Sequence, residues 1–130
     1  MNGPTAIKWF LASDGITPAT DMSVALVGLA SAGQGFYSTQ LGCAFQFVWP
    51  ATGAPNGAFG VQVSSDNVHT HYDDLSMDDA SQAPTQPTGG ADTTTIELPV
   101  GKWMSPYIRA TYTPSSGGTG AVLTGTWTAK

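Results

Sequence analysis

Phe45-Gln46-Phe47-Val48-Trp49 and Phe59-Gly60-Val61-Gln62-Val63-Ser64-Ser65-Asp66 are the two stretches that decide the fold. In both, apolar side chains recur at every second position, which is the period of a β-strand with one buried face. Pro50 and the pair Asn56-Gly57 lie between them. Proline ends strand pairing, and Asn-Gly favours the positive φ angles of a tight turn. The sequence therefore predicts two core strands joined as a hairpin.

Comparable extended segments recur along the whole chain. They cover 6–11, 23–29, 41–49, 59–66, 69–77, 93–98, 107–112 and 121–128. Turn residues such as Ser13-Asp14-Gly15 and the polar stretches 80–90 and 113–120 separate them, which predicts about eight strands. A short helix is the alternative for 23–29, which is apolar on both faces. We expect an all-β fold, a jelly-roll-like antiparallel β-sandwich, in one domain over residues 1–130, with residues 1–20 as an N-terminal contact arm.

Alternation along these segments also predicts which side chains face the core. Inward positions are expected at Ile7, Trp9 and Leu11, at Leu41, Cys43, Phe45, Phe47 and Trp49, and at Phe59, Val61, Val63, Ile108, Ala110 and Tyr112. Tyr107, Arg109 and Thr111 are expected to face outward. Cys43 is the only cysteine, so no intramolecular disulfide forms, and we expect it to be a small buried apolar residue.

Composition narrows the class of partner. Only 10% of the 130 residues are charged, and 4 basic against 9 acidic residues give a net charge of −5. Nucleic-acid binders need a basic surface to displace counterions, so no direct nucleic-acid partner is expected. A surface so poor in charge shields weakly against association, which predicts a homo-oligomer, a dimer or trimer, or docking on a larger partner. Met1 to Pro4 lacks the pattern of a signal peptide, and no apolar run has the length of a membrane span, so we expect synthesis in a cytoplasm and no membrane partner.

The residues that could carry chemistry form weak patterns. His69, His71 and Asp73 would share one face of a strand over 69–77, which makes a surface metal site one hypothesis. No further ligand completes that set, and the acidic residues Asp73, Asp74, Asp78 and Asp79 lack the spacing of a calcium-binding loop. The sequence has no Gly-x-Ser-x-Gly, phosphate-loop or paired-carboxylate motif. We therefore expect no enzyme activity, no cofactor and no metal.

Aromatic residues raise a carbohydrate-binding hypothesis, in which exposed rings stack on sugars. The candidates are Trp9, Trp49, Trp103 and Trp127 with Tyr37, Tyr72, Tyr107 and Tyr112. Trp49 and Trp127 fall on apolar strand faces, where a core role explains them better. Trp103 and Met104 lie between turn residues and are better candidates for an exposed contact.

Three stretches resemble small β-sandwich virion proteins of tailed bacteriophages, of the capsid cement or decoration type. They are Gln46-Phe47-Val48-Trp49, then Gly57-Ala58-Phe59-Gly60-Val61-Gln62-Val63-Ser64-Ser65-Asp66, and finally Tyr107-Ile108-Arg109-Ala110-Thr111-Tyr112-Thr113 with Ser116-Gly117-Gly118-Thr119-Gly120. Where related sequences tend to show an Asp-Gly turn and then a Trp, this chain has Asp66-Asn67 and then Tyr72.

The resemblance implies a structural role at the surface of a capsid. Many copies would bind the outside of the major capsid protein lattice and stabilise the head, so the expected location is the virion. The expected contact residues are Ile7, Trp9, Phe10, Trp103 and Met104, with Arg109 as a lattice salt bridge or a bidentate partner for a carboxylate. A neck, tail or fibre-base protein of the virion and a carbohydrate-binding β-sandwich module are the alternatives.

Overall fold

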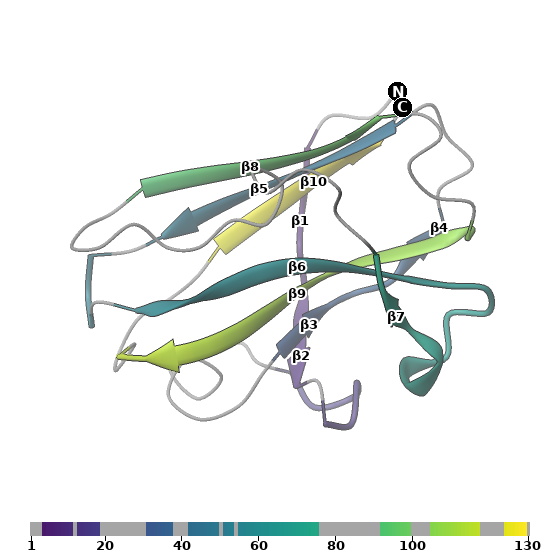
Figure 1. Ribbon diagram of the computed structural model, residues 1–130, viewed down its shortest axis with the longest axis horizontal. Helices are drawn as coiled ribbons and strands as arrows, with labels where there is room; N and C mark the ends of the chain where they lie inside the picture. Colours follow the sequence, from purple (N-terminus) through teal and green to yellow (C-terminus); the bar gives the residue numbers. More distant parts are fainter. Residues whose placement is uncertain are drawn as a thin grey trace.

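The computed structural model describes residues 4–11, 13–18, 31–37, 42–49, 51–53, 55–75, 92–99, 105–117 and 124–129. These residues form two antiparallel sheets packed face to face, with one short 3₁₀ helix and no α-helix (Figure 1). Sheet A contains β1 (Thr5–Ala6), β10 (Thr124–Ala129), β5 (Gly42–Trp49) and β8 (Asp92–Pro99), in that order. Sheet B contains β2 (Trp9–Leu11), β3 (Ser31–Gly33), β9 (Tyr107–Ser116), β6 (Asn56–Ser64) and β7 (Asp73–Asp74), and β4 (Phe36–Tyr37) also pairs with β9. The helix is η1 (His69–His71).

The strand pairs are nested along the chain. β1 pairs with β10, β3 with β9, β5 with β8, and β6 with β7. This nested order arises when one long hairpin rolls up and its successive segments alternate between two sheets. It is the strand order of a jelly roll. The all-β antiparallel sandwich expected from the sequence is therefore confirmed.

The prediction that the stretches 45–49 and 59–66 pair as a hairpin is wrong. β5 belongs to sheet A and β6 to sheet B, so the two strands face each other across the sandwich instead of pairing. The rings of Phe47 and Phe59 stack with centroids 3.7 Å apart. Each strand has one strongly apolar face, and packing these faces together buries both of them. The Asn56-Gly57 pair is not a turn but the start of β6, where the register shifts at a bulge, and the positive φ of 73° belongs to Gly53.

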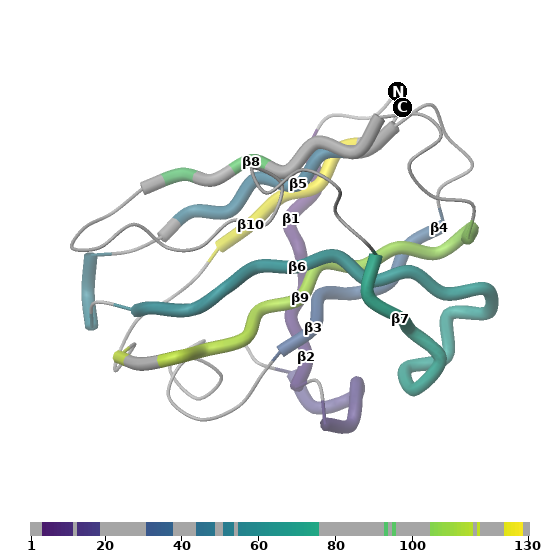
Figure 2. Tube along the Cα trace, viewed as in Figure 1, coloured from purple at the N-terminus to yellow at the C-terminus, as the bar shows by residue number. Residues whose placement is uncertain are grey.

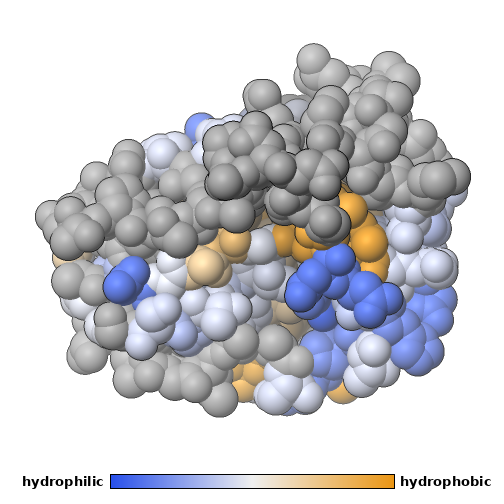
Figure 3. All heavy atoms as spheres, in the orientation of Figure 1, coloured by the Kyte–Doolittle hydropathy of each residue, from blue (hydrophilic) through white to orange (hydrophobic). Residues whose placement is uncertain are grey.

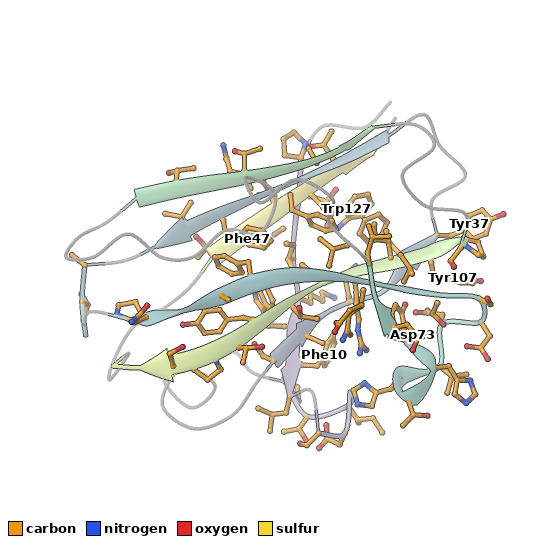
Figure 4. The ribbon with its side chains drawn as sticks, in the orientation of Figure 1. Phe10, Tyr37, Phe47, Asp73, Tyr107 and Trp127 are labelled. Atoms are coloured by element: carbon orange, nitrogen blue, oxygen red, sulfur yellow. The ribbon has the colours of Figure 1, made fainter. Side chains whose placement is uncertain are left out.

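The core between the sheets follows the alternation read from the sequence. Phe45 and Phe47 from sheet A meet Phe59, Ile108 and Tyr112 from sheet B, and all five side chains are buried. The stick view shows Phe47 and Trp127 pointing into the space between the two layers (Figure 4). Trp127 stacks on Phe36 with ring centroids 3.8 Å apart, so this contact also joins the two sheets.

The N-terminal segment is not one strand over 6–11. β1 ends at Ala6 in sheet A, and β2 begins at Trp9 in sheet B, so the chain crosses from one layer to the other (Figure 2). Ile7 lies at the crossing and Trp9 just after it, and both side chains are buried in the core. Two sheets need a connection at their edge, and these apolar side chains fill the space beneath it.

Two other boundaries differ from the sequence-based expectation. In the described part of the strand expected over 69–77, residues 69–75 form η1 and the two-residue β7 instead. The side chain of Asp66 accepts a hydrogen bond from the backbone N–H of Val68, and Asn67 adopts a positive φ of 61°, so the chain turns before it can continue as a strand. β9 continues to Ser116, where a flexible loop was expected, because it pairs with β6 as far as Asn56. The segments 23–29 and 80–90, Trp103, Met104 and the side chains of Cys43 and Trp49 lie outside the described residues.

Candidate functional site

Arg109, the only arginine of the chain, lies on the outer side of sheet B. Its neighbours Ile108 and Ala110 point into the core, as alternation predicts, and Arg109 points the other way. It is nevertheless only 8% exposed. A position that faces away from the core is therefore almost completely covered. The residues that cover it are Gln62 of β6 and, from the segment after β6, His69 and Tyr72.

The first contact of Arg109 is its cross-strand partner. Gln62 lies opposite Arg109 in the β6–β9 register, and its Oε1 accepts hydrogen bonds from Nε at 2.9 Å and from Nη2 at 2.6 Å. On the other side, Nε2 of Gln62 donates to Oδ1 of Asp74 in β7 at 3.0 Å. Among the described residues, one amide oxygen thus accepts from both of these N–H groups, and the carboxylate of Asp74 lies one residue further along the row. A carboxylate partner for Arg109 stays a prediction.

Tyr72 and His69 complete the enclosure of the guanidinium. Cζ of Arg109 lies 4.0 Å from the centroid of the Tyr72 ring, a cation–π distance. Nη1 lies 3.1 Å from Nδ1 of His69. Because a guanidinium nitrogen only donates, Nδ1 of His69 accepts, which assigns the neutral tautomer with the proton on Nε2. Burial lowers the pKa of Arg109 and raises the pKa of Tyr72.

A local hydrogen-bond network shapes the covering segment. Oδ1 of Asp66 accepts from the backbone N–H of Val68 at 3.1 Å, and Oδ2 lies 2.7 Å from Nδ1 of His71. The hydrogen bond to His71, followed by that to Val68, holds the pKa of Asp66 below its usual value. Asn67 follows with its positive φ, and its Oδ1 accepts from the hydroxyl of Tyr72. These bonds place the Tyr72 ring over Arg109.

Two glycines allow other segments to approach the covering loop. A Cβ atom on Gly35 would lie 2.1 Å from Oδ1 of Asn67 and from the Tyr72 hydroxyl. A Cβ on Gly15, whose φ is 66°, would lie 2.4 Å from the His69 ring. Gly15 belongs to the expected turn after β2, where the carboxylate of Asp14 accepts from both N–H and Oγ1 of Thr17. The site is therefore assembled from the loops after β2, β3 and β6 around a residue of β9.

Two adjoining hollows open over this cluster, with volumes of about 190 Å³ and 540 Å³. His69, Tyr72 and Arg109 line both, and the smaller one is completed by Phe10, Gln34 and Asn67 among others. Hydrophilic residues gather over β7 and the adjacent loop on the face shown in Figure 3. Within the described part of the chain, no carboxylate lies within ion-pair distance of Arg109.

The metal hypothesis finds no support in the geometry of the described residues. His71 binds Asp66, His69 contacts Arg109, and Asp73, which is labelled in Figure 4, lies in β7. No three His, Cys, Asp or Glu side chains in the described ranges come close enough to hold a metal ion. Asp78 and Asp79 lie outside those ranges.

Among the described aromatic candidates for sugar stacking, both tryptophans pack inside the domain. Trp9 is buried, and Trp127 is half-buried against Phe36. Tyr37 is 60% exposed and lies beside Tyr107, but the two rings meet edge to face at 69° (Figure 4). A two-ring platform for an extended glycan needs aromatic faces that lie in one plane, and the faces of Tyr37 and Tyr107 do not.

Four of the six predicted contact residues are described, and these four do not form one exposed surface. Ile7, Trp9 and Arg109 are buried, and Phe10 is half-buried beside the smaller hollow. The side chains of Ile7 and Trp9 thus pack in the core of the domain. A contact role for these residues, and for Trp103 and Met104, stays a prediction.

The outer face of sheet A has a different character. Two cross-strand rows run across β10, β5 and β8, namely Thr124, Val48 and Thr93, and Thr126, Gln46 and Thr95. Five of these side chains are exposed and Thr126 is half-buried. None is charged, and we call these six residues the neutral face. The strand register places these six positions side by side.

Comparison with protein-family models, with curated proteins and with solved structures found no match. No helix in the described ranges has the length and apolarity to span a membrane. The functional argument therefore depends on the surfaces and contacts given above.

Proposed function

We propose that this chain is a structural protein of a bacteriophage virion, a capsid cement or decoration protein that binds the outside of the major capsid protein lattice and stabilises the head. The neutral face carries the proposal. Centres of protein–protein interfaces are depleted of charged residues, and the two rows through Val48 and Gln46 provide an exposed surface without charge.

The strand order and the composition agree with this role. Jelly rolls occur in viral capsid proteins, although the same architecture also serves lectins and other proteins, so the fold supports the class without naming it. The resemblance of the β5, β6 and β9 sequences to phage virion proteins supplies the narrower assignment. The low content of charged residues, 10%, suits a protein that docks on a large partner.

A cement protein acts through repetition. Each copy that bridges neighbouring capsid subunits adds buried area that must be broken before the shell opens. Because a symmetric shell offers many equivalent sites, modest affinity at each site suffices when the copies also contact one another. In this mechanism the chain needs a flat docking face and a stable core, and it needs no catalytic group.

The first test is the copy number and position of the chain in purified particles, by quantitative mass spectrometry and electron cryomicroscopy. We expect hundreds of copies over the shell, with sheet A toward the major capsid protein. A single ring at one vertex would instead identify a neck, tail or fibre-base protein.

A pair of variants tests the neutral face. Thr95→Lys places a charge on it, and Thr70→Lys places the same charge on another exposed threonine, in η1. We expect Thr95→Lys to bind capsids at least tenfold more weakly and Thr70→Lys to bind like the parent protein. Equal binding of both variants would rule out the neutral face as the docking surface.

A further inference from the structure

We propose that the smaller hollow over Arg109 binds the carboxylate group of a small ligand of about monosaccharide size. The proposal is independent of the role in the virion. It starts from a mismatch of charge: Arg109 is 8% exposed, and no carboxylate among the described residues lies within ion-pair distance of it. Burying a cation without a counter-charge is costly, and a bound anion removes that cost.

The guanidinium retains hydrogen-bonding capacity toward the hollow. It has five N–H groups, and its contacts within the described residues use three of them, two with Gln62 and one with His69. Among the described residues, one N–H on each terminal nitrogen has no acceptor. A carboxylate has two oxygens with the spacing that such a pair of donors recognises.

The remaining lining offers neutral donors suited to an acid with hydroxyl groups. The side-chain amides of Gln34 and Asn67 line the hollow, and neither NH₂ group donates to a described residue. The neutral His69 carries its proton on Nε2 and adds another donor. Phe10 supplies an apolar wall for the body of the ligand.

Charge and volume favour a single carboxylate over a dianion. One negative charge neutralises Arg109, whereas the second charge of a phosphate would face a protein with a net charge of −5 and the nearby Asp74, which is hydrogen-bonded to Gln62. The hollow of about 190 Å³ is small, and the adjoining space of about 540 Å³ admits the ligand from the side of Thr70 and Thr111.

The test uses the single Arg109 Nε–H signal, which is unambiguous in an ¹H–¹⁵N spectrum because the chain has no other arginine. The full chain is titrated with sodium glucuronate, sodium acetate, glucose, sodium phosphate and sodium chloride at constant ionic strength and neutral pH. We expect a saturable shift with glucuronate, at about millimolar concentration, a weaker saturable shift with acetate, and none with glucose or chloride. No saturable shift with either carboxylate, or a phosphate midpoint as low as that of glucuronate, would overturn the proposal.

A variant that leaves Arg109 in place separates binding from folding. Asn67→Asp adds a negative charge to the lining while keeping a residue type that tolerates the φ of 61° and an oxygen that accepts from Tyr72. Ser65→Asp adds the same charge at an exposed neighbouring position. We expect Asn67→Asp to weaken glucuronate binding at least tenfold and Ser65→Asp to change it less than threefold. Equal effects of the two variants would show that the carboxylate does not bind in this hollow.

Discussion

The ring of Phe47 in β5 stacks on the ring of Phe59 in β6, with centroids 3.7 Å apart and an angle of 13° between the ring planes. The two residues come from strands that follow each other in the chain and belong to opposite sheets. Their contact is therefore a direct link between the layers. Trp9 contacts both rings, at centroid distances of 6.2 Å and 6.3 Å, so the chain crossing between β1 and β2 packs against the same point.

Removing the ring of Phe47 is expected to destabilise the domain strongly. Phe47→Ala leaves a cavity between the sheets, and such substitutions cost roughly 3–5 kcal/mol of unfolding free energy. Val48→Ala changes the next residue of the strand, on the exposed neutral face, and should cost about 0.5 kcal/mol or less. Urea unfolding followed by tryptophan fluorescence measures both. Similar losses for the two variants would contradict the packing described for β5.

The hydrogen bonds from Arg109 to Gln62 predict that two glutamines of the sandwich differ in their contribution to stability. Gln62→Ala removes the acceptor of two guanidinium N–H groups and leaves them buried, at a cost of about 1–3 kcal/mol. Gln46→Ala removes the same side chain from the outer face of β5, where it is exposed, and should change stability by about 0.5 kcal/mol or less. Equal denaturation midpoints would argue that Gln62 does not compensate the buried cation.

The turn at Asp14 predicts a dependence on acid. Hydrogen bonds from the Thr17 side chain, then from the backbone N–H groups of Thr17 and Ile16, lower the pKa of Asp14 from 3.8 to about 2. Because the folded pKa lies below the unfolded one, this stabilisation is complete above pH 3.8 and is lost as the pH falls toward about 2.

Thr17→Val removes the largest of these contributions and keeps the backbone donors. We expect the pKa of Asp14 to rise part of the way toward 3.8, as measured by ¹³C NMR of the side-chain carboxyl during an acid titration. Thr70→Val, at an exposed threonine of η1, is the matched control and should leave that pKa unchanged. A pKa that stays near 2 in Thr17→Val would exclude the hydroxyl as its main cause.

The approach of Gly35 to the covering loop predicts a steric effect. A Cβ atom there would lie 2.1 Å from both Asn67 Oδ1 and the Tyr72 hydroxyl, so Gly35→Ala forces that pair away and should cost about 1–3 kcal/mol. Gly60→Ala is a useful comparison because its Cβ would approach only Oγ1 of Thr111, at 2.9 Å. We expect a smaller loss for Gly60→Ala and a change in the Arg109 Nε–H shift for Gly35→Ala alone. An unchanged shift in Gly35→Ala would contradict this placement of Tyr72.

Sequence patterning was sufficient for the faces of the central strands. The apolar positions Phe45, Phe47, Phe59 and Val61 are buried where alternation put them, and the turn at Ser13-Asp14-Gly15 is present. Such features depend on neighbours in the sequence and on the pleat of a single strand. The partner of β5 could not be derived in this way, because a period of two says which face is buried and not which strand lies alongside.

The candidate site was less predictable than the core. Alternation correctly put Arg109 on the side away from the core, but it could not show that residues far away in the chain close over it, since Gln62 is 47 positions distant and His69 is 40. The positive φ of Asn67 and the glycines at 15 and 35 allow that closure. A lone arginine in a charge-poor strand was the one signal that pointed to it.

Local sequence thus specifies an all-β chain, the apolar face of each central strand and the turn at Asp14, because these follow from backbone preferences and from the burial of alternate side chains. The nested strand pairs, the stacking of Phe47 on Phe59, the contiguous neutral face and the enclosure of Arg109 arise only in the folded molecule. Each of them joins residues that are distant in the chain, and the free energy of burying two surfaces depends on which surfaces meet.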